Sequence, residues 1–129
     1  MPVKFTVNPK KDPRDQNAAP RYYASVKSSG RSDTNTIARN INSISTVSSV
    51  DTAAVIEAFL TVVPDKLAEG NIVELGDFGT FRLSISSEGA EAAEEVTSRS
   101  ITDRRVIFTP GKRFKQMLDT IEFQKENWS

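Results

Sequence analysis

The sequence of 129 residues contains neither cysteine nor histidine. Without cysteine there is no disulfide, no thiolate metal site and no cysteine nucleophile. Without histidine the chain lacks the commonest general base and the commonest ligand of transition metals. Glycine-rich phosphate loops are missing, and Asp77-Phe78-Gly79 resembles a kinase triplet without the other kinase motifs. We therefore expect a protein that is not an enzyme and has no metal, cofactor or small-molecule substrate.

Long apolar runs are also missing. The best one, residues 53–63, is interrupted by Glu57 and Thr61 and is far shorter than the roughly 20 residues that span a bilayer. The first residues lack the apolar core of a signal peptide. We expect no membrane partner and a cytoplasmic location.

The charge is balanced in total but not along the chain. Seventeen basic and seventeen acidic residues cancel. Residues 1–31 nevertheless hold seven cations against two carboxylates, and residues 99–118 hold six cations against one. Such segregation gives a neutral protein basic faces, which suit a polyanionic partner. The alternative interpretation is that both segments are ordinary solvated surfaces.

The first 31 residues predict a basic extension with two short strands. Residues 3–7 alternate apolar and polar side chains, as strands do, and residues 22–27 are again strand-like. Three prolines and several charged residues make 8–20 a loop. We expect this extension to be ordered only where it can pair with another strand.

Two helices follow. Asp33 or Thr34 is a plausible N-cap, and Ile37, Ala38 and Ile41 then recur at helical spacing. After a turn over 45–49, in which Ser48 or Ser49 would cap, a second helix carries a wide apolar stripe. Pro64 predicts a kink or a restart, and Gly70 predicts the end. The short turn implies an antiparallel pair.

The rest of the chain predicts strands at 72–75, 80–85 and 104–108. Strict alternation puts Phe81 and Leu83 on one face and Arg82 on the other. Residues 86–100, small, polar and acidic, predict a mobile arm. A short helix over 112–118 should turn Phe114, Met117 and Leu118 inward. A small strand at 121–123 should follow, with Trp128 packed on it.

The apolar stripe of the second helix exceeds what one subunit can easily cover, which favours a symmetric dimer. A monomeric α+β domain is the alternative. The side chains expected in the dimer core are Val55, Phe59, Val62, Val63, Phe78 and Phe81.

Two stretches carry a family resemblance. Residues 67–81 contain Gly70, a short strand and the turn Gly76-Asp77-Phe78-Gly79-Thr80-Phe81, and residues 108–115 read Phe-Thr-Pro-Gly-Lys-Arg-Phe-Lys. Both resemble the HU and integration-host-factor family of bacterial histone-like proteins. Asp77 is inserted relative to the family turn. The resemblance covers residues 32–118, and the flanking segments resemble an HU-related branch of Bacteroidetes type.

The resemblance implies an α+β fold: an antiparallel helix pair, a three-stranded sheet with a β-arm, a short C-terminal helix and an N-terminal β extension, assembled as an intertwined homodimer. The domains would be the extension (1–31), the HU-like DNA-binding domain (32–118) and a tail with a short strand (119–129). It also implies architectural, largely sequence-independent binding and condensation of double-stranded DNA in the nucleoid, through phosphate and minor-groove contacts.

The arm departs from the family pattern. No proline lies between Arg82 and Thr109, and Glu88, Glu91, Glu94 and Glu95 replace a basic tip. The alternative function is therefore an HU-derived protein-interaction or structural dimerisation module with weak or no DNA binding. The DNA-contacting residues expected are Arg82, Arg99, Arg104, Arg105, Lys112, Arg113 and Lys115, with Lys10, Lys11 and Arg14 as auxiliary contacts. Binding should weaken as salt rises.

Overall fold

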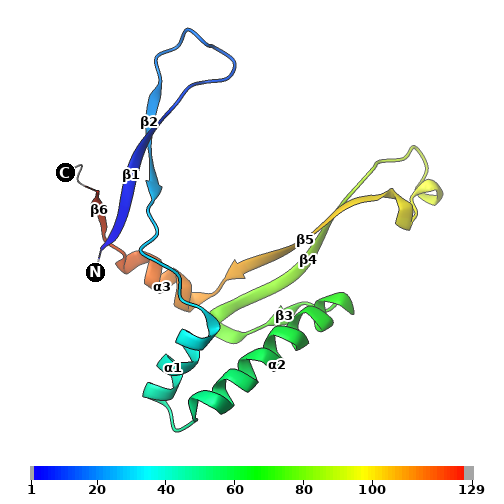
Figure 1. The fold of residues 1–129 in the computed structure, drawn as a ribbon. Coiled ribbons are helices and arrows are strands. Elements are labelled where there is room, and N and C mark those ends of the chain that lie inside the picture. Colours follow the sequence, from blue (N-terminus) through cyan, green and yellow to red (C-terminus); the bar gives the residue numbers. More distant parts are fainter. Residues whose placement is uncertain (1, 127–129) are drawn as a thin grey trace.

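The computed structural model describes residues 2–126. In chain order the elements are β1 (Val3–Lys10), β2 (Arg21–Val26), α1 (Thr34–Ile44), α2 (Ser49–Ala68), β3 (Val73–Glu74), β4 (Gly79–Ser87), β5 (Ile101–Pro110), α3 (Lys112–Thr120) and β6 (Phe123–Lys125). The expected mixture of helices and strands is confirmed. Figure 1 shows two long hairpins, β1–β2 and β4–β5, that diverge from the region of α3, with α1 and α2 beneath the second hairpin.

Side-chain caps fix where the two helices of the pair begin. The Asp33 carboxylate accepts a hydrogen bond from the Thr36 backbone N–H at 2.9 Å, and Ser48 Oγ accepts one from the Asp51 N–H at 3.1 Å. Hydrogen bonds from the Thr36 backbone and hydroxyl hold the pKa of Asp33 below its ordinary value. Both caps were among the sequence predictions, and both satisfy backbone donors that a helix start leaves free.

The second helix is not interrupted at its proline. α2 is one continuous helix from Ser49 to Ala68 with Pro64 inside it, so of the kink or restart predicted at this proline, the restart does not occur. Its end is as predicted: the N–H of Gly70 donates to the Leu67 carbonyl at 3.0 Å and the N–H of Asn71 to the Lys66 carbonyl at 3.1 Å. This pair of bonds is a Schellman motif. None of the helices within residues 2–126 is long and apolar enough to cross a membrane.

The β4–β5 hairpin forms one sheet with β3, in the order β3-β4-β5. Its register pairs Phe81 with Phe108 and Leu83 with Val106, so these four side chains share a face. The strands are longer than predicted, and the hairpin ends in 3-10 turns at Ala93–Glu95 and Ser98–Ser100. Of the expected arm, residues 86–100, only Ser86 and Ser87 therefore belong to the sheet, and the rest forms the loop and turns at the end of the hairpin.

The two stretches that carry the family resemblance contact each other. The N–H of Gly111 donates to the Phe78 carbonyl at 2.9 Å. A methyl group on Gly79 would lie 2.6 Å from the Phe108 ring, and one on Gly111 would overlap the Asp77 carbonyl. Both positions therefore require glycine because the backbones approach too closely for a side chain.

A cluster of four phenylalanines joins the base of the hairpin to α3. The rings of Phe78, Phe81, Phe108 and Phe114 have neighbouring centroids 4.7 to 5.8 Å apart, in tilted and edge-to-face arrangements. Such aromatic pairs add stability beyond the area they bury. The cluster fixes α3 against the hairpin. Phe114 is half-buried as predicted, whereas Met117 and Leu118, also predicted to point inward, remain exposed in the single chain.

A second three-stranded sheet unites the two ends of the chain in the order β2-β1-β6. β1 runs antiparallel to β2 and parallel to β6, pairing Val3 with Phe123 and Phe5 with Lys125. The extension therefore docks on its own subunit. The last strand lies two residues beyond the predicted start, and Trp128 lies outside the described residues.

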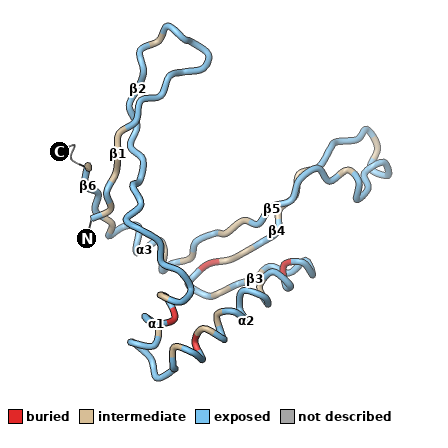
Figure 2. Tube along the Cα trace, viewed as in Figure 1, coloured by how far each residue is buried: buried red, intermediate tan, exposed pale blue. Residues whose placement is uncertain are grey.

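The single chain has almost no core. Among residues 2–126 the only buried hydrophobic side chains are Ala38 and Leu67. Figure 2 shows that nearly all of the chain is exposed or partly exposed. The chain exposes 11197 Å², against about 6,800 Å² expected for a compact protein of this mass. The projecting hairpins explain part of the excess. The rest comes from α2, where Val55, Phe59 and Val62 are 65, 44 and 52% exposed.

Candidate nucleic-acid interface

The β4–β5 hairpin has two different faces. One face turns toward α2, because Phe81, Leu83 and Val106 line an apolar groove together with Val63 and Leu67 of that helix. Directly opposed residues of an antiparallel pair share a face. The residues between them must therefore point away from α2, on the outer face.

The outer face carries Arg82 and Arg105. Arg82 lies opposite Ile107 and Arg105 opposite Ser84, so the two arginines are diagonal neighbours on adjacent strands. Nη1 of Arg105 donates to Ser86 Oγ and to Asp103 Oδ2, both at 3.1 Å. Arg82 has no ionic partner among residues 2–126. An arginine has five N–H donors, so both guanidinium groups keep donors for an anion.

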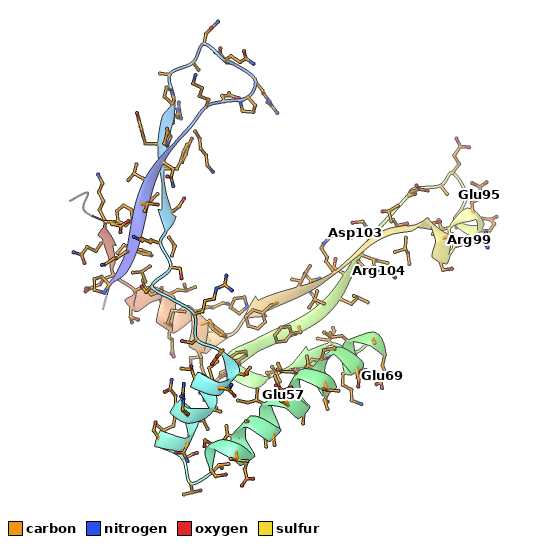
Figure 3. All side chains as sticks on the ribbon, in the orientation of Figure 1. Glu57, Glu69, Glu95, Arg99, Asp103 and Arg104 are labelled. Atoms are coloured by element: carbon orange, nitrogen blue, oxygen red, sulfur yellow. The ribbon has the colours of Figure 1, made fainter. Side chains whose placement is uncertain are left out.

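Arg104 lies on the other face. Its register partner is Ile85, which places it with Phe81 and Leu83 on the side of α2. Figure 3 shows Asp103 and Arg104 leaving the arm on opposite sides. The structure therefore does not bring Arg104 and Arg105 together, although both were predicted to meet one DNA surface. The alternation of side chains along a strand was the signal that separates them.

The arm tip is acidic. Arg99 lies in the turn Ser98–Ser100, and Glu95 is at the same end of the arm (Figure 3). All four arm glutamates lie between the two strands, and no ion pair joins any of them to an arginine within the described part of the chain. Arg99 is therefore the only cation in a negative tip.

Three more predicted cations lie on α3. Phe114 faces the aromatic cluster, so Lys112, Arg113 and Lys115 are distributed over the remaining, exposed sides of this helix. The helix begins where β5 ends, at the base of the hairpin. These cations therefore form a second exposed positive group, at the base of the hairpin.

The auxiliary residues form a separate group. Lys10, Lys11 and Arg14 lie at the tip of β1–β2, which projects in a different direction from β4–β5 (Figure 1). Sequence reasoning missed Arg21, which pairs directly with Lys10 across the strands. Only the register, which the sequence does not give, brings these two cations together.

The comparisons with known proteins agree with this architecture. A family model described as HU-HIG, "HU domain fused to wHTH, Ig, or Glycine-rich motif", matches residues 1–125. No curated protein matches the chain. A solved structure from Bacteroides vulgatus, described as a "Putative bacterial DNA binding protein", is 15% identical and superposes with a TM-score of 0.63. The similarity covers 98% of this chain and 50% of that one, so this chain spans half the length of its structural neighbour.

Proposed function

Because the chain belongs to the HU-HIG family of fused HU domains, we propose that it is an architectural protein that binds double-stranded DNA as a homodimer. The contacts are to phosphates and the minor groove and are largely independent of sequence. The structural neighbour is itself described as a DNA-binding protein. A DNA ligand would localise the protein to the bacterial nucleoid, where binding by many copies condenses the chromosome.

One observation carries this proposal: the outer face of the β4–β5 hairpin presents Arg82 and Arg105 away from the hydrophobic side of the sheet. Arginine donates pairs of hydrogen bonds to phosphate and enters narrow minor grooves. The cations of α3 add a second positive group at the base of the hairpin. The remaining predicted contacts, Arg99 and Arg104, lie at the acidic tip and on the opposite face, so they contribute less.

The homodimer is supported by the exposed side chains of the single chain. Moving the apolar stripe of α2 from water into an interface stabilises the dimer by about 25 cal/mol per Å² of apolar area buried. The groove lined by Val63, Leu67 and Phe81 is open and apolar, which suits the same stripe of a second copy. Val55, Phe59, Val62 and Phe78 are exposed in one chain and would complete the core of two. Light scattering should therefore give twice the chain mass of 14.2 kDa.

The DNA proposal is tested by fluorescence anisotropy on one duplex at several salt concentrations. The wild type should bind with an affinity that falls as salt rises. Replacing Arg82 and Arg105 with glutamine removes four cations from a dimer, which should reduce the slope of log affinity against log salt by roughly 3 to 4. Arg99→Gln with Arg104→Gln removes the same number of cations, from the acidic tip and the opposite face, so it is the matched control and should change the slope much less.

Two results would contradict the proposal. The first is no binding of the wild type at low salt. The second is an unchanged slope in the double variant. The acidic arm tip favours the alternative, a protein-interaction or structural dimerisation module derived from HU. That function predicts a dimer that does not bind duplex DNA even at low salt.

A further inference from the structure

The β1–β2 hairpin is held at its base and open at its tip. At the base, the Val3 N–H donates to the Glu122 carbonyl at 2.7 Å, and the Glu126 N–H donates to the Phe5 carbonyl at 2.9 Å. An ion pair between Lys27 and Glu126 lies beside them. The tip, residues 10–21, projects away from the rest of the chain (Figure 1). The parallel pairing with β6 therefore fixes where the tip points.

Positive charge is concentrated at this tip. Lys10 and Arg21 face each other directly across the two strands. Like charges in this position are destabilising unless an anion lies between them. Lys10 Nζ also lies 5.7 Å from the centre of the Tyr23 ring, and the side chain of Tyr23 is 48% exposed. The tip therefore contains two opposed cations that repel each other, and a bound anion would relieve this repulsion.

The nearby carboxylates do not neutralise these cations. Oδ1 of Asp12 accepts the backbone N–H of Arg14 at 2.9 Å, and Oδ1 of Asp15 accepts the backbone N–H of Asn17 at 3.0 Å. Within residues 2–126, neither carboxylate forms an ion pair with a tip cation. Both therefore serve to shape the loop. The lining of a hollow at the tip includes Lys10, Lys11 and Arg21 together with Asp12, so it holds three cations and one carboxylate.

We propose that the hairpin tip, through Lys10, Lys11, Arg14 and Arg21, binds backbone phosphates of duplex DNA outside the segment contacted by β4–β5. This inference rests on the proposed function. The two hairpins point in different directions, so a second group of phosphate contacts would lie on flanking DNA and lengthen the binding site (Figure 1). The four proposed contacts are all cationic side chains, and phosphate contacts alone read no sequence.

The test measures affinity against duplex length with the full chain. The tip variant is Lys10→Gln with Arg21→Gln. Its control, Lys4→Gln with Lys125→Gln, removes two exposed cations from the base of the same sheet. On short duplexes the tip variant should bind like the wild type. On long duplexes it should lose at least roughly sixtyfold in affinity at 0.1 M salt, as expected for two lost phosphate contacts at one hairpin, and more if both hairpins of a dimer engage. The control should lose much less.

The outcomes separate this inference from the proposed function. Equal affinity of the tip variant and the wild type on long duplexes overturns the inference, and equal loss on short and long duplexes does so too. If Arg82 and Arg105 variants still weaken binding in that case, the proposed function stands. A wild type that binds no duplex overturns both. Thermal unfolding provides the folding control, because removing the Lys10–Arg21 repulsion should leave the tip variant at least as stable as the wild type.

Discussion

Replacing Gly79 with alanine tests whether the backbone conformation and close packing at the start of β4 require a glycine. Gly79 has a φ of 148° and a ψ of −170°, a region that is essentially restricted to glycine. Holding alanine there costs about 1–3 kcal/mol. The new methyl group would also lie 2.5 Å from the Thr109 carbonyl oxygen and 2.6 Å from the Phe108 ring. Crowding of this kind costs about another 1–3 kcal/mol.

Two further alanine variants separate these costs. Gly111 has an ordinary φ of −90°, but a methyl group there would overlap the Asp77 carbonyl, so Gly111→Ala carries only the crowding cost of about 1–3 kcal/mol. Gly89 lies in the arm and has open space around it, so Gly89→Ala should be neutral or stabilising by up to about 1 kcal/mol. Gly79→Ala should be the most damaging, at about 4 kcal/mol.

Urea unfolding followed by circular dichroism measures this series. All variants must be compared at one protein concentration, because the stability of a dimer depends on it. The free energy of unfolding should be highest for Gly89→Ala, lower for Gly111→Ala and lowest for Gly79→Ala. A Gly79→Ala protein within about 0.5 kcal/mol of the wild type, the range of ordinary surface changes, would refute the close approach of the two motifs.

Two other predictions concern charge. The pKa of Asp33 lies below its ordinary value of 3.8 because Thr36 donates to the carboxylate, so ionised Asp33 stabilises the fold above that value. The advantage of the wild type over Asp33→Asn in urea should therefore be present at pH 7 and disappear as the pH falls below 3.8. Replacing the four arm glutamates with glutamine should raise duplex affinity by on the order of tenfold at low salt, measured by anisotropy. Unchanged affinity would mean that the arm tip stays away from DNA.

The sequence predicted the parts of the fold that depend on local signals. The caps at Asp33 and Ser48 and the stop at Gly70 all lie where their residue types predicted them. At Pro64 the sequence predicted a kink or a restart, and the helix does not restart, because a proline weakens only some bonds of a 20-residue helix and the remaining bonds keep it continuous. Local patterns therefore predicted where the helices begin and end better than whether they are continuous.

Pairing between distant segments was beyond the sequence. Nothing in residues 3–10 indicates that they pair in parallel with 123–125, because the sequence of a short strand does not specify which strand it pairs with. The same limit hid the Lys10–Arg21 pair, which exists only in one register. The opposite faces of Arg104 and Arg105, by contrast, could have been predicted, because side chains alternate along a strand. Only the structure shows which of the two faces meets α2.

The distribution of charge limits how this protein can hold DNA. The glutamates at the arm tip repel phosphates, so attraction is strongest at the inner part of the arm and at α3, where Arg82, Arg105 and the helix cations lie. Sharp kinks in minor-groove complexes come from apolar or proline wedges inserted between bases. No proline lies between Arg82 and Thr109. DNA along a β4–β5 arm without a proline wedge should therefore bend gently there, and the length of the bound DNA should depend on how far the β1–β2 tip reaches along the flank.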